Sequence, residues 1–281
     1  MEQYRILGRI GEGAHGVVFK AKHAETGEIV ALKKVALRRL EDGIPKQALR
    51  EIKALREVED SQYDLKPANL LISASGQLKI ADFGLARVFS SDGSRLYTHQ
   101  VATRWYRAPE LLYGARQYDQ GVDLWAVGCI MGELLNGSPL FPGENDIEQL
   151  CCVHRILGTP SPQVWPEITE LPDYNKISFK DRAPVPLEEV LPDASAQALD
   201  LLGQFLLYPP RQRIPASQAL LHQYFFTAPL PAHPSELPIP QRTGGPAPKA
   251  PPGPPHIRDF DVDRPLEESL LNPELIRPFI L

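Results

Sequence analysis

The chain has 281 residues, of which 43% are hydrophobic and 23% are charged, and its net charge is -5. This composition is that of a globular protein with room for one large domain or two lobes. The acidic balance gives no basic surface for nucleic acid or for an anionic membrane, so we expect neither as a partner. Three cysteines, Cys129, Cys151 and Cys152, form neither a disulfide framework nor a C-x-x-C pair, which favours a reducing compartment.

The start of the chain and its apolar stretches predict no targeting or spanning segment. No basic segment followed by an apolar run opens the sequence, so we expect no secretory leader. The longest apolar stretch, Val122 to Leu135, is interrupted by Asp123 and Glu133 and is too short to span a bilayer. We therefore expect an intracellular protein.

Residues 4–35 alternate between apolar and polar side chains and predict a three-stranded antiparallel meander. The expected strands are 4–10, 17–21 and 29–35. Gly11, Gly13 and Gly16 lie between the first two strands, and not between a strand and a helix. This position argues against a dinucleotide-binding fold and favours a flap whose backbone approaches phosphate groups. The alternation also places Lys33 among apolar neighbours, where an ammonium group needs an anionic partner.

A helix is expected at about 45–59, because a proline stands near its start and apolar residues follow at helical spacing. Glu51 lies beside that apolar stripe. One interpretation is a solvated flank with a surface pair to Arg50 or Lys53. The other is an ion pair that aims Lys33 at phosphate oxygens, and the glycine flap favours this second interpretation.

Three polar clusters follow in order, at 64–69, 82–84 and 108–110. Between the first two, the apolar runs at 70–72 and 78–81 are joined by a short polar turn and predict a hairpin. That hairpin would bring Asn69 and Asp82 to the same end. An amide beside a carboxylate, with Asp64 and Lys66 a few residues earlier, suits divalent metal and phosphate chemistry. Any one cluster alone is better explained as a polar turn, but three in order favour a site.

Together these motifs resemble those of a eukaryotic protein kinase. The residues that carry the resemblance are Gly11-x-Gly13-x-x-Gly16-x-Val18, Val30-Ala31-Leu32-Lys33, Glu51, Asp64-x-Lys66-x-x-Asn69, Asp82-Phe83-Gly84 and Ala108-Pro109-Glu110. The segments at 48–52 and 103–110 are similar to the cyclin-dependent type. The resemblance implies an α+β, bilobal protein-kinase-like fold with a small antiparallel β lobe and a larger, mainly α lobe. The implied parts are an N-terminal lobe at 1–63, a C-terminal lobe at 64–227 and a proline-rich tail at 228–281.

The resemblance further implies transfer of the γ-phosphate of ATP to a serine or threonine, with ATP and Mg2+ as cofactors. The residues expected around ATP are Ile10, Gly11, Glu12, Gly13, Gly16, Val18, Ala31, Lys33 and Glu51. Asp64, Lys66 and Asn69 are the expected catalytic residues: Asp64 would receive the proton of the acceptor hydroxyl and Lys66 would lie near the transferred group. Asn69 and Asp82 would hold Mg2+.

Regulation is implied by Thr98, which stands where the family carries a phosphorylated threonine. Its phosphate would gather Arg50 and Arg87, although an exposed hydroxyl in a loop is the alternative. Thr103 and Arg107 belong to the part that selects a serine or threonine followed by proline. The implied partners are protein substrates with Ser/Thr-Pro and a cyclin or cyclin-like activator, and the implied role is cell-cycle control in the nucleus and cytoplasm.

The rest of the larger lobe is expected to be helical. Residues 123–131 are apolar on nearly all sides and predict a buried helix that ends at Asn136-Gly137. Further helices are expected at 147–157 and 195–207, and the resemblance implies an ion pair between Glu110 and Arg213. Residues 229–255 are dense in proline and cannot bury a core. The final apolar run, 266–281, either docks back or binds a partner.

The sequence departs from the family pattern between the first helix and the catalytic loop. Only twelve residues separate Glu51 from Asp64, so two strands, the hinge that bonds adenine and the first two helices of the larger lobe have no counterpart. Gln62-Tyr63 replaces the His-Arg expected before Asp64. We therefore expect an internal deletion that affects adenine recognition, the arginines around a phosphorylated Thr98 and the packing partner of the buried helix.

Three hypotheses follow from this departure. The chain is a proline-directed serine/threonine kinase, or a catalytically inactive, splice-like form that acts as a partner-binding or decoy protein, or an incomplete product without a stable fold. An in-frame deletion would leave the motif residues untouched, so their presence indicates kinase ancestry and not activity. We expect this chain to transfer phosphate very poorly.

Overall fold

The computed structural model describes residues 3–13, 16–34, 61–62, 65–73, 76–81, 87–88, 103–233, 236 and 260–262. The chain divides into two compact units. The first contains the N-terminal strands, and the second contains the β5–β6 hairpin at 70–80 and the helices that the structure describes. Expected features at Arg50, Glu51, Asp64, Asp82 and Thr98 lie outside the described residues.

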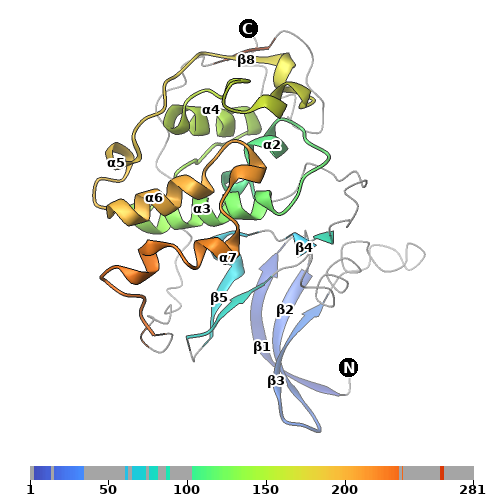
Figure 1. Cartoon of the computed structure of the whole chain (residues 1–281). Coiled ribbons are helices and arrows are strands. Elements are labelled where there is room, and N and C mark those ends of the chain that lie inside the picture. The colour runs from blue at the N-terminus through green and yellow to red at the C-terminus, as the bar shows by residue number, and fades with distance from the viewer. Residues whose placement is uncertain are drawn as a thin grey trace, which may run out of the picture. The chain divides into compact units, whose positions relative to one another are not determined.

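The first unit is a three-stranded antiparallel sheet in the order β1-β2-β3 (Figure 1). Its strands are β1 (Tyr4–Gly13), β2 (Gly16–His23) and β3 (Ile29–Lys34). The predicted meander is confirmed, although β1 and β2 extend into the glycine motif, where a loop was expected. The turn between β2 and β3 includes Gly27 with φ 72°, a left-handed conformation that glycine adopts without a Cβ penalty.

The second unit begins with a short loop and a hairpin. After the short 3-10 helix η3 (Pro67–Asn69), strand β5 (Leu70–Ile72) pairs antiparallel with β6 (Leu78–Ile80). The predicted hairpin is confirmed. Two further strands of two residues each are β4 (Ser61–Gln62) and β7 (Arg87–Val88).

The rest of the second unit is mainly helical (Figure 1). Its α-helices are α2 (Pro109–Leu112), α3 (Gly121–Asn136), α4 (Asp146–Leu157), α5 (Leu187–Val190), α6 (Ala196–Phe205) and α7 (Ala216–Ala219). Its 3-10 helices are η5 (Arg104–Tyr106), η6 (Pro166–Glu170), η7 (Tyr174–Lys176), η8 (Pro210–Gln212) and η9 (Gln223–Phe226), and strands β8 (Ile177–Phe179) and β9 (Phe260–Val262) pair antiparallel. None of the helices in the described part of the chain is long and apolar enough to cross a membrane.

Helix α3 is the centre of this unit, because its buried side chains join the main hydrophobic core. Trp125 stacks on Phe141 with ring centroids 5.9 Å apart. The helix ends where the sequence predicts: Gly137 has φ 72° and its N–H donates to the carbonyl of Glu133 at 2.8 Å. The predicted helices near 147–157 and 195–207 are confirmed as α4 and α6, and the Ser195 hydroxyl caps α6 by accepting from the N–H of Ala198.

One side of α3 departs from the expected burial. Val127 is 36% exposed and Leu134 is 79% exposed. They lie seven residues apart and thus on one face of the helix. A helix that is apolar on all sides is usually buried on all sides, but this face of α3 is exposed.

Candidate active site

Lys66 and Asn69 come from the loop that precedes β5. Leu65 anchors this loop in the main core, and Pro67 begins η3 directly after Lys66. The Lys66 ammonium donates to the hydroxyl of Thr103 at 2.8 Å, although the two residues are 37 positions apart in the chain. The structure therefore brings together one expected catalytic residue and one residue of the expected substrate-selecting segment.

Asn69 is buried at the start of the hairpin, and its backbone carbonyl accepts from the N–H of Ala81 at 2.8 Å. Ala81 directly precedes Asp82, which lies outside the described residues. The backbone thus follows the course expected for a hairpin that brings Asn69 and Asp82 to one end. Asn69 offers a hard amide oxygen, a ligand type that suits Mg2+.

The nucleotide-binding residues expected from the glycine motif lie in the first unit. Val18 of β2 stands opposite Lys33 of β3 in the sheet register, and both side chains are half-buried. Ala31, two residues earlier on β3, is exposed. Ile10, Gly11, Glu12, Gly13 and Gly16 are described only as backbone of β1 and β2.

The expected regulatory residues cannot be brought together from the described residues. Thr98 and Arg50 lie outside them, and Arg87 is described only as backbone of β7. Phosphorylation of Thr98 therefore stays a prediction.

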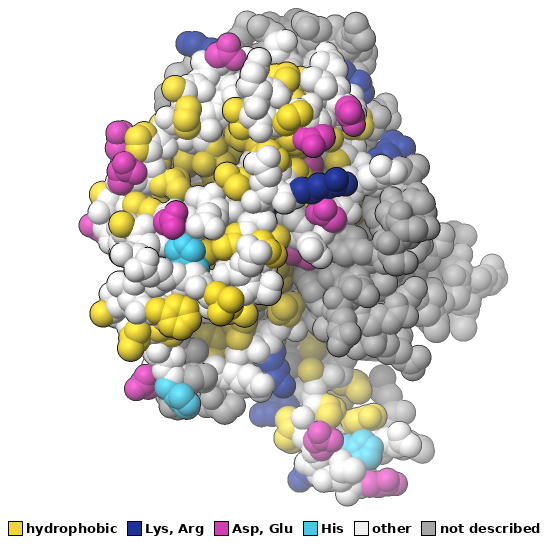
Figure 2. Space-filling view, viewed as in Figure 1, with side chains coloured by type: hydrophobic (Ala, Val, Ile, Leu, Met, Phe, Trp, Pro, Cys, Tyr) yellow, Lys and Arg dark blue, Asp and Glu magenta, His cyan; other side chains and the backbone are white. Residues whose placement is uncertain are grey.

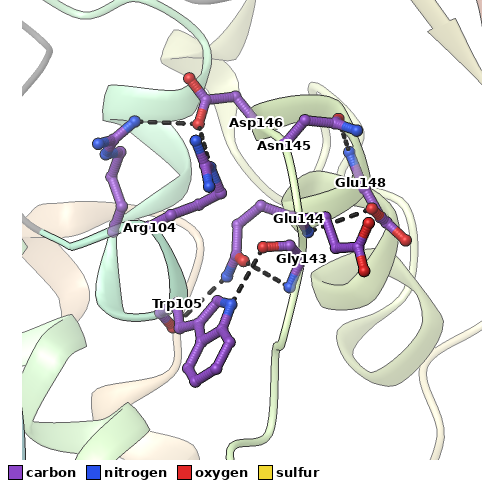
Figure 3. Close-up of polar contacts among 9 residues, drawn as sticks. Arg104, Trp105, Gly143, Glu144, Asn145, Asp146 and Glu148 are labelled. Atoms are coloured by element: carbon purple, nitrogen blue, oxygen red, sulfur yellow. Dashed lines mark hydrogen bonds and ion pairs between the residues drawn. The ribbon is translucent and has the colours of Figure 1, made fainter. Parts of the chain in front are cut away.

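Asp146, the first residue of α4, ties this helix to the segment that follows Thr103. Its Oδ1 accepts from Arg104 Nε and from Arg107 Nη1, each at 3.0 Å (Figure 3). Asp146 is buried and Arg104 is half-exposed. The hydrogen bonds from these two guanidinium groups to one carboxylate are charge-assisted, and such bonds are stronger than hydrogen bonds between neutral groups.

Main-chain contacts reinforce the same junction (Figure 3). Trp105 Nε1 donates to the carbonyl of Gly143 at 3.0 Å, and the N–H of Gly143 donates to Gln149 Oε1 at 3.0 Å. A Cβ on Gly143 would overlap the backbone of Gln149, so the turn requires glycine here. The Asn145 side chain accepts from the N–H of Glu148 and caps α4.

Tyr106 joins η5 to α3. Its hydroxyl donates to Glu133 Oε2 at 2.7 Å. Burial raises the pKa of Tyr106 well above its ordinary value, and the hydrogen bond and negative charge of Glu133 raise it further. The phenol therefore stays protonated and serves as a donor.

The expected pair between Glu110 and Arg213 is confirmed. Both guanidinium Nη atoms donate to the Glu110 carboxylate at 2.7 Å, and both side chains are buried. Arg213 also donates to the carbonyls of Gly121, Leu207 and Tyr208. Arg213 thus joins Glu110 of α2, 103 positions away in the chain, to the carbonyl of Gly121 at the start of α3.

A family model described as "Protein kinase domain" matches residues 4–63 and 61–225. The chain belongs to the protein kinase family. It is 76% identical over 343 residues to Cyclin-dependent kinase 20 of Mus musculus, covering 100% of this chain and 99% of the relative. Its identity to Cyclin-dependent kinase 20 of Homo sapiens is 73% over 344 residues, again with 100% and 99% coverage, and to that of Danio rerio 62% over 340 residues, with 99% and 98% coverage.

Among solved structures, the kinase resembles a chain of the CAK complex from Chaetomium thermophilum bound to ATP-gamma-S. The TM-score is 0.75 at 29% sequence identity, covering 84% of this chain and 94% of that chain. The expected membership of the cyclin-dependent group is confirmed by these comparisons. The N-terminal antiparallel sheet and the helical lobe are those of a protein kinase fold.

Sequence reasoning missed the junction that Asp146 makes in this kinase. The signal for the α4 start was present, because Asn145 followed by Asp146 and Glu148 is typical of a helix N-terminus. Its partner Arg104 lies 42 positions away, and no local pattern links the two. A buried carboxylate needs a cation, but only the fold chooses which one.

Proposed function

We propose that this chain is an ATP-dependent serine/threonine kinase of the cyclin-dependent, proline-directed type by descent, and that its phosphoryl transfer is strongly impaired. The observation that carries this proposal is the length of the alignment with the mouse relative. The 343 aligned positions compare with 281 residues, so at least 62 positions have no residue of this chain.

The site of the missing segment is suggested by the family match. Its two matched pieces, 4–63 and 61–225, meet directly before the catalytic loop. This is where the sequence lacks a hinge and the first helices of the larger lobe. We therefore divide the chain into a shortened N-terminal lobe at 1–63, a C-terminal lobe at 64–227 and a proline-rich tail at 228–281.

Several parts of phosphoryl-transfer chemistry are retained. Lys33 and Glu51 would contact ATP phosphates with the glycine flap, Asn69 and Asp82 would hold Mg2+, and Asp64 would orient the acceptor hydroxyl. Bound Mg2+ would neutralise charge on the phosphate oxygens. Lys66 donates to Thr103, so it would link the phosphoryl-transfer site to the peptide-selecting segment. The solved neighbour was bound to ATP-gamma-S, which is consistent with ATP as the nucleotide.

The proposed substrates are proteins with a serine or threonine followed by proline. Thr103 and Arg107 would select them, and the junction of Arg104 and Arg107 with Asp146 supports a preformed segment for this purpose. A cyclin or cyclin-like activator, a role in the cell cycle and a nuclear and cytoplasmic location follow from the relatives by analogy only.

The alternative is a catalytically inactive form that binds partners or acts as a decoy. One observation favours this alternative. The alignment lacks residues of this chain at many positions, but the helical lobe keeps its buried Glu110–Arg213 pair and its junction at Asp146. A lobe of this kind could bind proteins without transferring phosphate.

The deciding experiment is a thermal unfolding scan of the full chain with and without Mg2+ and a non-hydrolysable ATP analogue. A ligand that binds only the folded state raises the transition temperature. If the remnant site binds nucleotide, the transition moves upward, and the shift disappears in Lys33→Ala and Asp82→Ala. A cooperative transition that nucleotide leaves unmoved favours the inactive, partner-binding form.

A phosphorylation assay tests the impairment itself. We expect the purified chain to transfer almost no phosphate to a Ser-Pro peptide, because the segment that would bond adenine is missing. The matched control is Asp64→Asn, which removes the expected proton acceptor. Phosphorylation well above that control would contradict the proposed impairment.

A further inference from the structure

A pocket of about 660 Å3 opens in the helical unit between the loop after α2, η6 and η8. Its apolar lining includes the buried side chains of Ala115 and Trp165 and the half-buried side chains of Leu171 and Pro172. Its volume lies within the range of about 300–1,000 Å3 that is typical of ligand pockets. Such pockets bind apolar groups, and a few polar groups fix the orientation of what is bound.

Charged side chains of both signs also line this pocket. The exposed ones are Arg116, Asp119, Glu167, Glu170 and Arg211. Figure 2 shows charged side chains of both signs beside hydrophobic ones, near the place that α2 occupies in Figure 1. The buried carboxylate of Glu110, which lines the pocket as well, is already matched by Arg213. The pocket therefore suits an apolar segment that carries charges of both signs.

The C-terminal part of the chain returns to this unit at β8. Strand β9 pairs with β8, and Phe260 stands opposite Phe179 and Val262 opposite Ile177. Because the pairing is antiparallel, the chain after Val262 continues toward the residues that precede Ile177. Those residues are η7 and, before it, Pro172 of the pocket lining. The end of β9 thus directs the following residues toward the pocket.

Backbone and side-chain contacts hold the start of β8 near the pocket. The N–H of Asp173 donates to the carbonyl of Tyr113 at 3.1 Å, which bonds the segment after η6 to the loop after α2. The ammonium group of Lys176, directly before β8, donates to the buried carboxylate of Asp173 at 2.8 Å. Two sides of the pocket are therefore joined to each other and to the end of β8 that β9 reaches.

The chain after β9 is long enough to reach the pocket. Pro172 lies five positions before Ile177, so the two are at most about 18 Å apart, and a paired strand lies about 5 Å away. Eight extended residues span about 26–29 Å, so residues from 270 onward can enter the pocket. Residues 270–281, which we call the terminal segment, contain seven large apolar side chains and one charge of each sign, Glu274 and Arg277.

We propose that the terminal segment docks in this pocket of its own chain. Its apolar side chains match the apolar lining, and its two charges meet exposed charges of both signs. The pairing of β9 with β8 tethers the segment, and a short tether gives an effective concentration on the order of millimolar. A second copy or another protein at micromolar concentration lacks this advantage. The docking needs no nucleotide, so it does not depend on the proposed function.

Photochemical crosslinking of the full chain tests the docking directly. Phe279 is replaced by p-benzoylphenylalanine, and the purified chain is irradiated at low micromolar concentration. Chains that stay monomeric are separated from covalent dimers, and their crosslinked peptides are identified by mass spectrometry. We expect crosslinks within the monomer to peptides that contain 113–119 or 165–172, because these segments line the pocket.

Two substitutions should prevent these crosslinks. Leu171→Glu places a charge in the apolar lining, and Leu275→Glu places one in the terminal segment. Each should lower the crosslink yield at least about 10-fold, because an unpaired charge is costly to bury. Leu275→Glu leaves every pocket residue unchanged, so it keeps the test valid if Leu171→Glu does not fold.

The matched control is Leu134→Glu, which places the same charge on an exposed leucine of α3 that does not line the pocket. It should leave the crosslink yield within a factor of about two of the unsubstituted chain. Unchanged circular dichroism confirms that each variant is folded.

Four outcomes overturn the proposal. Crosslinks that occur only in covalent dimers assign the pocket to a second copy of the chain. Crosslinks to other parts of the monomer, or none at all, show that the terminal segment does not lie in the pocket. A yield that Leu275→Glu leaves unchanged contradicts docking through apolar side chains. Equal losses in all three glutamate variants indicate non-specific adhesion.

Discussion

His154 is a buried histidine at the junction of α4 with an aromatic cluster. It is 2% exposed, its ring lies 4.6 Å from that of Phe179, and its Nε2 is 3.3 Å from the hydroxyl of Tyr113. Burial, together with a smaller effect of the positive charge of Arg182, lowers the pKa of His154 to about 3. The folded chain therefore keeps this ring neutral where an unfolded chain would protonate it.

The consequence is a loss of stability in mild acid. Below the unfolded pKa of about 6.5 the unfolded chain binds a proton that the folded chain excludes, so the free energy of unfolding falls by up to about 1.4 kcal/mol per pH unit until about pH 3. We expect His154→Gln to flatten this slope between pH 6.5 and 5. Urea unfolding at several pH values measures it.

The control for this prediction is His233→Gln, because His233 is exposed. It should leave the slope between pH 6.5 and 5 as it is in the unsubstituted chain. A slope that His154→Gln does not change would contradict the neutral, buried state of His154.

Removing one partner of the buried Glu110–Arg213 pair is expected to lower the free energy of unfolding by a large amount. Arg213→Met would leave the buried Glu110 carboxylate without its cation, so we expect a loss of about 3–5 kcal/mol in the free energy of unfolding. The substitution Arg211→Met removes an exposed arginine, so it should change the free energy of unfolding only slightly. Tryptophan fluorescence during urea unfolding reports both, because all three tryptophans lie in the helical unit.

At the scale of elements, α3 and α6 approach closely at a glycine. A Cβ on Gly128 would come within 2.7 Å of Phe205 Cβ and 2.9 Å of Leu206 Cδ2. Phe205 Cβ is next to the α6 backbone and cannot rotate away, so the two helices would have to separate. The two helices can therefore pack this closely only because Gly128 has no side chain.

We expect Gly128→Ala to lower the free energy of unfolding by about 1–3 kcal/mol, because an added methyl overpacks this contact. Gly137→Ala is the matched control at the end of the same helix. It has open space around the added Cβ and φ 72°, so only the left-handed backbone is penalised, by about 1 kcal/mol. If Gly128→Ala costs no more than Gly137→Ala, the close packing of α3 on α6 is contradicted.

At the scale of the whole molecule, stability is expected to be unevenly distributed. Trp125 and Cys129 of α3 are buried in the main core, whereas Leu71 and Leu78 of the β5–β6 hairpin are more than half exposed. Regions with few buried apolar contacts open locally, at a lower free energy than global unfolding. We expect the amides of β5 and β6 to exchange at least about 100-fold faster than those of α3.

Native-state hydrogen exchange followed by mass spectrometry measures this difference. Peptides that span 121–136 should keep their amide hydrogens long after peptides that span 70–80 have lost theirs. Equal protection in the two regions would indicate that the hairpin is held as firmly as the core, against its exposure in the structure.

Much of the fold could be predicted from the sequence because local rules govern it. Alternation defined the meander, and two apolar runs joined by a polar turn defined the β5–β6 hairpin. An apolar helical run followed by Asn136-Gly137 defined the end of α3. The motif residues of the site were identified by the resemblance to protein kinases. Their roles in chemistry stay predictions, because Asp64, Asp82 and Glu51 lie outside the described residues.

The sequence by itself determined the kinase family and the local elements. Only the tertiary structure decided that Lys66 bonds Thr103, that Asp146 takes both Arg104 and Arg107, and that one stripe of α3 is exposed. The physical reason is that backbone periodicity depends on near neighbours in the chain. The choice of a cation for a buried carboxylate, or of a cover for an apolar face, depends on residues that only folding brings together.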